Sequence, residues 1–313
     1  MPAEPNPGLF CARRSGGAAK SGRNRPRVLS IAGSDSSGGA GIQADIKVIT
    51  CLGGYAMTAV TAITAQDTRQ VAGIHVVPPE FVAQQIEMCI ADIGLDAAKT
   101  GMLFGAPTVR AVAEVLRKHR VAHLVVDPVI FSTSGRRLLD EPGEAALIRE
   151  ILPLCEVVTP NLAEASRLAG FEVADLPAMR RAAEAIARFG PRAVWIKGGH
   201  LAGPPTDLLY DGKDFLELPS ERIETKDAHG AGCALSAALA TELARGLELH
   251  DAARRAKQFI TEALRHSQRL GKGRGPTDPL AAAQALGLLK HRGTEDAEKN
   301  GEARRKFSRN LES

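Results

Sequence analysis

Residues 27–52 read RVLSIAGSDSSGGAGIQADIKVITCL, and this stretch decides the fold. Residues 27–32 form a short apolar run that ends at Gly33, as a buried strand does. A polar, glycine-rich loop follows, and a segment with helical periodicity begins at Ile42. Strand, glycine loop and helix in this order is the context in which backbone amides bind a phosphate or another small ligand. The loop lacks Gly-Lys-Ser/Thr at P-loop spacing and the Gly-x-Gly-x-x-Gly dinucleotide signature, so the sequence predicts a ligand site of another kind.

The same alternation of strand and helix continues along the chain to residue 246, and no proline- or glycine-rich linker interrupts it. This pattern predicts one α/β domain, a three-layer α/β/α sandwich with a mostly parallel central sheet. Further strands are expected at 55–65, 97–103, 121–127, 156–161 and 193–199, a hairpin at 207–219, and helices at 79–93, 108–120, 144–152, 162–169, 179–189 and 250–269. We predict that the domain spans residues 26–290, between a disordered basic arm at 1–25 and a disordered polar tail at 291–313.

The composition restricts the classes of function. The 313 residues carry a net charge of +4 and only 4% of them are aromatic, so a stacking platform for single-stranded nucleic acid is not expected. The five cysteines are scattered without a Cys-x-x-Cys pair, which favours a reducing compartment over a disulfide framework or structural zinc. No apolar run approaches the roughly 18–20 residues that span a bilayer. We expect a cytoplasmic protein with no nucleic-acid or membrane partner, although the Arg-rich start of the chain is also compatible with an organelle-targeting peptide.

A second glycine turn stands before a helix near the end of the domain. Residues 224–246 read ETKDAHGAGCALSAALATELARG. Glycines directly before a helix allow backbone amides to converge on an anion, and the helix N-terminus adds partial positive charge. The same position predicts a lowered pKa for the Cys233 thiol. The alternative is a tight turn followed by a cysteine that serves only as a small buried apolar residue.

Polar residues recur where the predicted strands end. Asp127 precedes Pro128 and is a candidate Mg²⁺ ligand or an ordinary Asp-Pro turn. Asn161 and Glu164 have the spacing of a capping box, which explains both residues and does not exclude a water-mediated Mg²⁺ site. Ligands of open α/β sheets bind at the carboxyl ends of the strands. The residues expected there are Gly33, Gln66, Lys99, Asp127, Thr159, Lys197 and the loop 229–233.

Together these motifs resemble the hydroxymethylpyrimidine/phosphomethylpyrimidine kinases of thiamine biosynthesis. These enzymes form a branch of the ribokinase-like superfamily that also contains pyridoxal kinases. The resemblance runs from about residue 28 to residue 276, and its motifs appear in the family's order. They are IAGSDSSGGAGIQADIK at 31–47, TAITAQDT at 61–68, KTGML at 99–103, VVDPV at 125–129, TPNLAE at 159–164, KGGH at 197–200 and HGAGC at 229–233.

The resemblance implies a role for each motif. Gln66 would hydrogen-bond the aminopyrimidine, and Cys233 as a thiolate would accept the proton of the substrate hydroxyl. The remaining implied residues are Gly33, Asp45, Met102 and Val129 around the pyrimidine, Lys197, Thr225 and Lys226 at the ATP phosphates, Asp127 and Glu164 at Mg²⁺, and the backbone amides of Gly230, Ala231 and Gly232 at the transferred phosphoryl group. The family also implies a homodimer.

The implied reaction is an ATP- and Mg²⁺-dependent phosphorylation of 4-amino-5-hydroxymethyl-2-methylpyrimidine, followed by phosphorylation of the monophosphate to the pyrophosphate. The chain departs from the family's His-Gly-Thr-Gly-Cys-Thr motif, because Ala231 and Ala234 replace both threonines. The late Gly-His-Gly-x-Gly-Pro pattern reads GKGRGP at 271–276 and lacks its histidine. Two alternatives stay open: a pyridoxal/pyridoxine kinase of the same branch, and a non-catalytic vitamin- or nucleotide-binding regulator.

Overall fold

The computed structural model describes residues 25–132 and 135–289. The predicted arm and tail fall on residues 1–24 and 290–313, outside the described residues apart from Arg25, and stay predictions. Within the described part of the chain, no helix combines the length and the apolar character that crossing a membrane requires.

The centre of the molecule is one sheet whose order is β3-β2-β1-β4-β5-β6-β7-β8-β9. Strand β1 pairs in parallel with β2 on one side and β4 on the other, and β5, β6 and β7 continue in parallel. Strands β3, β8 and β9 run antiparallel at the two edges. The strands are β1 Arg27–Ser34, β2 Tyr55–Gln66, β3 Val71–Val76, β4 Ala97–Thr100, β5 Leu124–Val126, β6 Val157–Val158, β7 Ala193–Ile196, β8 Thr206–Tyr210 and β9 Phe215–Pro219. The chain leaves β1 first toward β2 and later toward β4, so β1 marks the switch point at which such sheets bind ligands.

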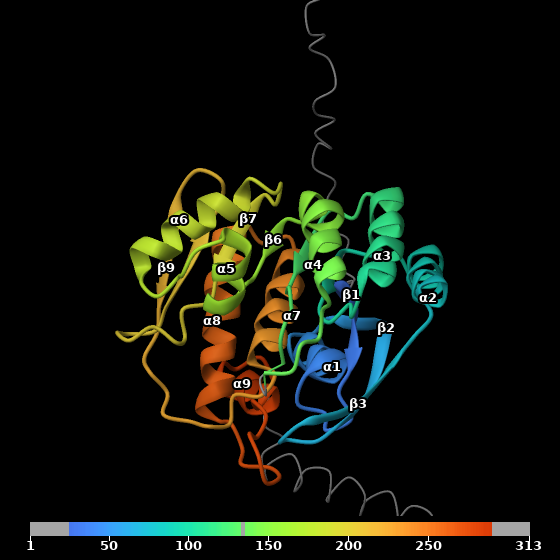
Figure 1. Cartoon of the computed structure of the whole chain (residues 1–313). Helices are drawn as coiled ribbons and strands as arrows, with labels where there is room; N and C mark the ends of the chain where they lie inside the picture. The colour runs from blue at the N-terminus through green and yellow to red at the C-terminus, as the bar shows by residue number, and fades with distance from the viewer. Residues whose placement is uncertain (1–24, 133–134, 290–313) are drawn as a thin grey trace, which may run out of the picture.

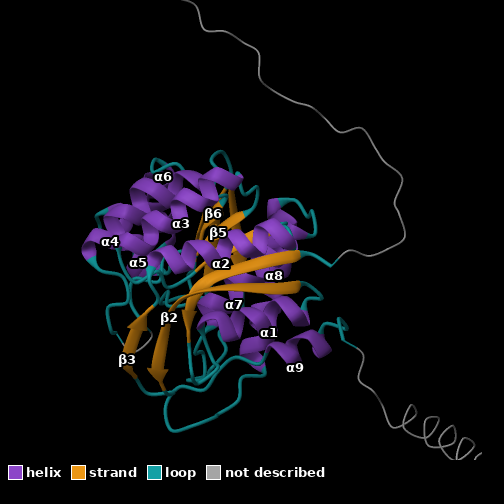
Figure 2. Cartoon of the chain, turned by 90° about the vertical axis from the view of Figure 1, so that its right-hand side faces the viewer, coloured by secondary structure: helices purple, strands orange, loops and turns teal. Residues whose placement is uncertain are grey.

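Helices cover both faces of this sheet and complete the three predicted layers (Figures 1 and 2). One layer contains α2 Pro79–Asp92, α3 Ala106–His119, α4 Glu141–Ala146, α5 Leu162–Ala169 and α6 Leu176–Ala187. The other contains α1 Gly41–Cys51, α7 Ala231–Ala244, α8 Leu249–Arg265 and α9 Pro279–Ala285. Each layer encloses its own apolar core against the sheet, which confirms the predicted α/β/α sandwich.

Two elements differ from the sequence prediction. The hairpin strand β3 was not expected, because Gly73 and His75 weaken the alternation that identifies a strand. The helix expected at 144–152 begins instead at Glu141, where the Asp140 side chain accepts a hydrogen bond from the Gly143 amide at 2.7 Å. It continues as a π-helical turn over Leu147–Ile151. The hairpin of β8 and β9, by contrast, is confirmed.

Helix α7 is the most deeply buried helix of the sandwich. Residues 234–243 are all buried, between the sheet on one side and α1 and α8 on the other. Its alanines allow this close packing, since larger side chains would not fit between three neighbours. The helix N-terminus, which carries the second glycine turn, is therefore held rigidly at the carboxyl edge of the parallel strands.

Candidate active site

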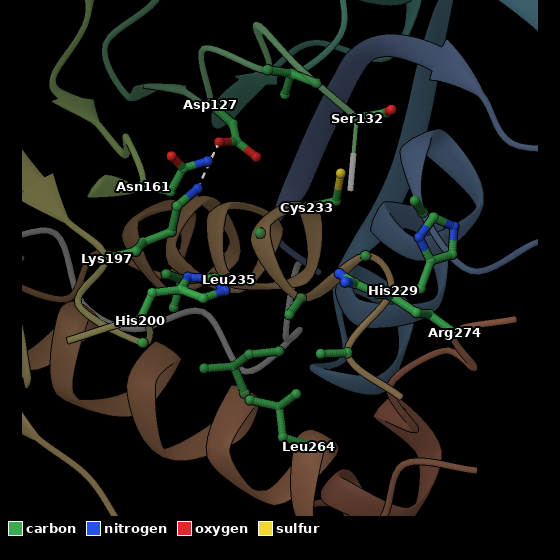
Figure 3. A pocket seen from close by; sticks show the side chains of 18 of the residues that line it. Asp127, Ser132, Asn161, Lys197, His200, His229, Cys233, Leu235, Leu264 and Arg274 are labelled. Atoms are coloured by element: carbon green, nitrogen blue, oxygen red, sulfur yellow. Dashed lines mark hydrogen bonds and ion pairs between the residues drawn. The ribbon is translucent and has the colours of Figure 1, made fainter. Parts of the chain in front are cut away.

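A cleft of about 880 Å³ lies at the carboxyl ends of the parallel strands. It brings together most of the predicted site residues, namely Gly33, Gln66, Met102, Asp127, Val129, Glu164, Lys197, Thr225, Gly230, Ala231, Gly232 and Cys233. Asp45 and Lys226 do not line it, and neither do Lys99 and Thr159. Figure 3 shows Asp127, Lys197 and Cys233 around the same space, with His229 and Arg274 on the opposite side.

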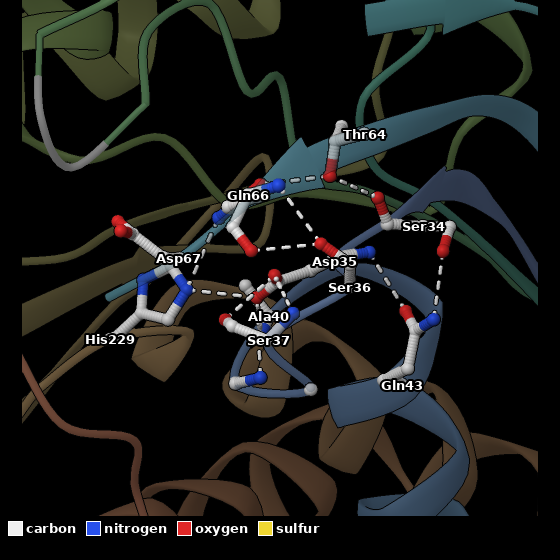
Figure 4. A network of polar contacts seen from close by, with 12 residues as sticks. Ser34, Asp35, Ser36, Ser37, Ala40, Gln43, Thr64, Gln66, Asp67 and His229 are labelled. Carbon is white, nitrogen blue, oxygen red and sulfur yellow. Dashed lines mark hydrogen bonds and ion pairs between the residues drawn. The ribbon is translucent and has the colours of Figure 1, made fainter. Parts of the chain in front are cut away.

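The first glycine loop is organised by Asp35, a residue that the sequence analysis did not single out. Asp35 Oδ1 accepts hydrogen bonds from the amide of Ser37 at 2.8 Å and from its hydroxyl at 2.7 Å. Oδ2 accepts from the amides of Gly39 at 3.2 Å and Ala40 at 2.8 Å. Figure 4 shows the carboxylate at the centre of the loop. One carboxylate of the loop itself occupies the amides of Ser37, Gly39 and Ala40, while Gly33, Ala40 and Gly41 of the same loop line the cleft.

The same carboxylate links the loop to the second glycine turn. His229 Nε2 lies 2.9 Å from Asp35 Oδ2 and 3.3 Å from Nε2, the side-chain amide nitrogen, of Gln66. Burial alone would raise the pKa of Asp35, but the hydrogen bonds from His229, Ser37 and Ala40 lower it to about 2. Asp35 is therefore ionised at neutral pH and joins the first glycine loop to His229. Aspartate before a glycine-rich run was the available signal for this residue.

The two glycine turns are in direct backbone contact. Gly230 has φ +78°, and a Cβ on it would lie 1.9 Å from the carbonyl oxygen of Gly39. A Cβ on Gly39 would in turn lie 2.5 Å from the His229 ring. Any side chain at either position would push the turns apart, which is the reason that glycine is needed here. The turns form one wall rather than two independent loops.

The N-terminus of α7 presents unoccupied amides to the cleft. The amide of Ala231 donates to the carbonyl of Ala228 at 3.2 Å, and that of Ala234 donates to Gly230 at 2.8 Å. Among the described residues, the amides of Gly232 and Cys233 have no acceptor within the protein. Such amides at a helix start attract anions. The amide of Gly230 likewise has no acceptor among the described residues, so of the predicted anion trap only the amide of Ala231 is engaged.

Cys233 is half-buried at the cleft wall, and the structure corrects the expectation for its thiol. Burial raises the pKa of Cys233 to about 11, and the nearby carboxylates of Asp45 and Asp127 act in the same direction. The ammonium of Lys99 and the amide of Gly41 oppose this shift without reversing it. The prediction of a lowered pKa is wrong because desolvation at this site outweighs the helix N-terminus. At neutral pH the group is a thiol.

Asp127 and Lys197 form an ion pair beside the start of α7. Lys197 Nζ lies 2.9 Å from Asp127 Oδ1, and both side chains are largely buried. Burial would lower the pKa of Lys197, but the charges of Asp127 and Glu164 raise it, so the lysine is cationic. A Cβ on Gly232 would lie 3.3 Å from Lys197 Nζ and 3.5 Å from Asp127 Oδ2. The ion pair therefore lies directly beside the free amides of α7.

Glu164 fastens the turn that follows Asp127. Its Oε1 accepts from the amide of Ile130 at 3.2 Å, and its Oε2 accepts from the amide of Asn161 at 3.0 Å. With the Asn161 side chain bonded to the Glu164 amide, the predicted capping box is confirmed. The turn holds Val129 at φ +42°, a backbone strain of about 1–3 kcal/mol for such a residue. Burial raises the pKa of Glu164, and Lys197 opposes that rise.

Of the two carboxylates predicted to bind Mg²⁺, Asp127 is better suited to the ion than Glu164. Asp127 offers the hard oxygen ligands that Mg²⁺ prefers, whereas both oxygens of Glu164 already accept backbone hydrogen bonds. No cluster of three or more His, Cys, Asp or Glu side chains capable of holding a metal occurs in residues 25–132 and 135–289. Mg²⁺ typically binds one or two carboxylates together with waters and substrate phosphates, so the residues fit a metal brought in with a nucleotide.

Asp45 lies beneath the cleft rather than on its surface. Its carboxylate receives Lys99 Nζ at 2.8 and 3.0 Å and the Ser30 hydroxyl at 2.5 Å, and all three side chains are fully buried. Burial would lower the pKa of Lys99, but Asp45, Cys233 and Asp127 raise it. This pair supports the floor of the cleft below Cys233. The expected direct contact between Asp45 and a substrate has no counterpart in the lining of the cleft.

The acceptor side of the cleft is narrow and mostly apolar. Gly33 is essential to its shape, since a Cβ there would lie 2.5 Å from the terminal methyl of Met102. Met102 packs with Val129 and Leu138, and Gln66 borders this group. The backbone amide of Gln66 donates to Ser36 Oγ at 2.9 Å, so the residue is held in place before any ligand binds. An amide side chain beside an apolar slot is suited to a flat heterocycle with polar edges.

On the side of the cleft where the nucleotide is expected, only some of the predicted residues line the cleft. Thr225 lines the cleft, and its hydroxyl is 2.9 Å from that of Ser267 and accepts from the amide of Asp227 at 3.0 Å. Lys226 is not among the residues that line the cleft. Ile223, Ile260 and Leu264 provide an apolar surface next to Thr225. These aliphatic residues were missed because their spacing resembles that of an ordinary core face.

Solved structures place this architecture in a known class. The pyridoxal kinase of Bacillus subtilis, solved as an ADP complex, is 38% identical with a TM-score of 0.77, and the match covers 84% of this chain and all of that one. The fold and the cleft therefore define a ribokinase-like kinase.

Within that class the family is specific. The sequence model of the phosphomethylpyrimidine kinase family matches residues 35–278, and the chain belongs to this family. The hydroxymethylpyrimidine/phosphomethylpyrimidine kinase of Rhizobium meliloti is 49% identical, over 80% of this chain and 95% of the relative. The thiamine biosynthesis bifunctional protein ThiED of Geobacter sulfurreducens is 48% identical, over 83% of this chain. The match covers only 53% of that longer protein.

Proposed function

We propose that this protein phosphorylates 4-amino-5-hydroxymethyl-2-methylpyrimidine and then its monophosphate, as a kinase of thiamine biosynthesis. In the first step the hydroxymethyl oxygen attacks the γ-phosphorus of ATP, the bond from that phosphorus to the β–γ bridging oxygen breaks, and ADP leaves. The hydroxyl proton is lost in the process. In the second step an oxygen of the monophosphate attacks a second ATP in the same way.

One observation carries the proposal. The backbone contact between Gly230 and Gly39 joins the acceptor slot to the start of α7, so the amides of Gly232 and Cys233 face the same cleft as Gln66. Phosphoryl transfer depends mainly on alignment and on stabilising charge at the equatorial oxygens. Amides fixed by a buried helix provide both without reorganising.

The roles of the remaining residues follow from their positions. Gln66 would bind the polar edge of the pyrimidine between Met102 and Val129. Lys197 would bind ATP phosphates, with Thr225 next to them and Lys226 nearby in the chain. Asp127 would hold Mg²⁺ through water, with Glu164 keeping the Asp127 turn in place. When bound, Mg²⁺ neutralises phosphate charge.

Cys233 has a smaller role in this proposal than a thiolate base would have. A pKa of about 11 leaves little thiolate at neutral pH. The transition state of phosphoryl transfer is loose, so the proton of the acceptor leaves late and the cradle of amides contributes more. Ala231 and Ala234 remove two hydroxyl groups but leave the backbone amides of the cradle intact.

A pyridoxal or pyridoxine kinase is the second candidate, because a kinase of that kind is 38% identical over 84% of this chain. It would use the same cleft for another flat heterocyclic alcohol. A homodimer and a cytoplasmic location also belong to the proposal.

The test is a kinase assay of the purified protein with ATP, a Mg²⁺ titration and a panel of acceptors. We expect ATP turnover to depend on Mg²⁺ and on the pyrimidine alcohol, and the pyrimidine monophosphate to be accepted as well. Turnover with pyridoxal in preference to the pyrimidine, and no turnover of the monophosphate, would favour the second candidate. No acceptor-dependent turnover at all would exclude both.

A further inference from the structure

The second phosphorylation creates an electrostatic problem that the first does not. The acceptor is then a phosphate of about −1.5 to −2 charge, and it must approach the triphosphate of ATP. Like charges brought together in a cleft repel unless a cation lies beside the incoming group. The chain must therefore supply positive charge on the acceptor side.

Most cationic side chains that line the cleft already have partners. Lys197 pairs with Asp127 at 2.9 Å, and Lys257 pairs with Asp207 at 2.9 Å. The guanidinium of Arg222 donates to the carbonyls of Leu201 at 2.6 Å and Gly203 at 2.7 Å.

Among the lysines and arginines that line the cleft, Arg274 is the exception. It lines the cleft, and its guanidinium has neither an ion pair nor a hydrogen bond with any of the residues that the structure describes. Figure 3 shows its side chain reaching into the cleft near His229. Arginine is well suited to an incoming phosphate, since its planar fork binds two oxygens at once.

The backbone of Arg274 is fixed on the acceptor side. Its amide donates to the carbonyl of Thr68 at 2.9 Å, and the amide of Gly273 donates to the Thr68 hydroxyl at 3.0 Å. A Cβ on Gly273 would lie 2.1 Å from the Thr68 carbonyl oxygen, so only glycine permits this contact. Thr68 closely follows Gln66, the residue proposed to bind the pyrimidine. On the other flank, the amide of His229 donates to the carbonyl of Gly275 at 3.1 Å.

We infer that Arg274 binds the phosphate of the monophosphate acceptor and so determines whether the second phosphorylation takes place. The inference rests on the proposed function. In the second step an anionic oxygen of the acceptor phosphate attacks the γ-phosphorus of ATP, a P–O–P bond forms, and the bond to the β–γ bridging oxygen breaks as ADP leaves. Arg274 neutralises the acceptor phosphate and turns one of its oxygens toward the amides of Gly232 and Cys233. This makes Arg274 a specificity-determining residue.

The experiment compares the two acceptors in Arg274→Gln and in the wild type. A hydrogen bond to a charged group is worth enough to change a rate or an affinity by about 10- to 100-fold. We expect the ratio of kcat/KM for the monophosphate to kcat/KM for the alcohol to fall by about that factor. Arg274→Lys, which keeps the charge but not the fork, should recover part of the ratio.

The matched control is Lys272→Gln, which removes an exposed cation from the same loop without touching the cleft. It should leave both rates and their ratio unchanged. A ratio that falls equally in the control would assign the effect to the general charge of the loop and overturn the inference. So would an unchanged ratio in Arg274→Gln, or a wild type that phosphorylates the alcohol but not the monophosphate.

A binding measurement separates this inference from the proposed function. Calorimetric titration with the pyrimidine monophosphate, in the absence of ATP, reports the contact without any turnover. If the wild type turned over neither acceptor, the proposed function would fail. The titration alone would then test whether Arg274 contacts the phosphate of the monophosphate. A Kd for the monophosphate at least tenfold weaker in Arg274→Gln would support the inference, and a Kd within twofold of the wild type would overturn it.

Discussion

The two glycine turns of the cleft have similar sequences and opposite uses. In the first turn the amides of Ser37, Gly39 and Ala40 all donate to Asp35, so the turn is complete without a ligand. In the second turn the amides of Gly232 and Cys233 have no acceptor within the described protein. A glycine motif before a helix therefore does not by itself identify an anion site. The presence or absence of an internal carboxylate decides whether the turn is a structural support or a binding surface.

The variant expected to have the largest effect on the difference between the two turns is Gly230→Ala in the second turn. The added Cβ would stand 1.9 Å from the Gly39 carbonyl oxygen, and φ is +78°. Both turns must then move, so we expect kcat to fall by about 10²–10³, the loss seen when a stabilising donor is misplaced. Thermal unfolding and steady-state kinetics on the same preparation measure the two effects.

The matched control for that variant is Gly38→Ala in the first turn. Gly38 has nearly the same backbone, φ +81°, but the closest atom to its Cβ would be Lys47 Nζ at 3.5 Å. It should cost only about 1–2 kcal/mol of backbone strain and keep most activity. Equal kinetic losses in the two variants would contradict the division of roles between the turns.

Cys233→Ala sharpens the role of the second turn. We expect kcat for the alcohol acceptor to fall by about tenfold at pH 7, below the roughly 10²–10⁴-fold that a general base contributes, with little change in KM. If the thiolate is the base, wild-type kcat should rise about tenfold per unit between pH 7 and 9, because the pKa of about 11 lies above that range.

The monophosphate acceptor supplies the control for Cys233. Its phosphate oxygens are already largely ionised at pH 7, so its phosphorylation should show no such slope and a smaller loss in Cys233→Ala. A pH profile recorded with both acceptors and both proteins makes the comparison. Identical profiles for the two acceptors would remove the thiol from proton transfer.

Asp35→Asn breaks the first turn. The pKa of Asp35 is lowered from 3.8 to about 2 in the folded protein, so the ionised carboxylate stabilises the fold above pH 4 and loses this contribution as the pH falls toward 2. We expect the variant to lose roughly 2 kcal/mol of unfolding free energy at pH 7 and progressively less in acid. Denaturant titrations at several pH values measure the difference.

The control for Asp35 is Asp251→Asn on the exposed surface of α8, which should change stability by less than about 0.5 kcal/mol. If the loss of unfolding free energy in Asp35→Asn stays constant from pH 7 to pH 2, the charge of Asp35 is not what stabilises the turn.

The smallest effect is expected from Gln66→Ala, at the junction of the two turns. Gln66 contacts both Thr64 and His229, and its loss should raise the pyrimidine KM about tenfold with kcat largely kept. Gln70→Ala, exposed in the adjoining hairpin, is the control and should not change KM. A fall in kcat without a change in KM would place Gln66 in the alignment of the phosphoryl group rather than in acceptor binding.

Much of the fold was accessible from the sequence because it depends on local patterns. The apolar run at 27–32, the cap formed by Asn161 and Glu164, and the Asp211-Gly212 turn of the β8–β9 hairpin depend on residues close in the chain. Periodicity and capping predict such elements, and their alternation predicts a parallel sheet with a ligand edge. Strand β3 and the start of α4 were not predicted, because Gly73 and His75 weaken the strand alternation and Pro142 weakens the helical periodicity.

The chemistry of the site depended on contacts that no local pattern contains. Asp35 and His229 are 194 positions apart, yet their contact joins the two turns. The availability of the Gly232 amide, the raised pKa of Cys233 and the burial of Asp45 with Lys99 each depend on which distant groups exclude water or supply charge. The sequence by itself determined the sandwich, its ligand edge and the residue types gathered there. Only the tertiary structure decided which amides stay free and which carboxylates are already used, because desolvation and hydrogen-bond competition act between neighbours in space.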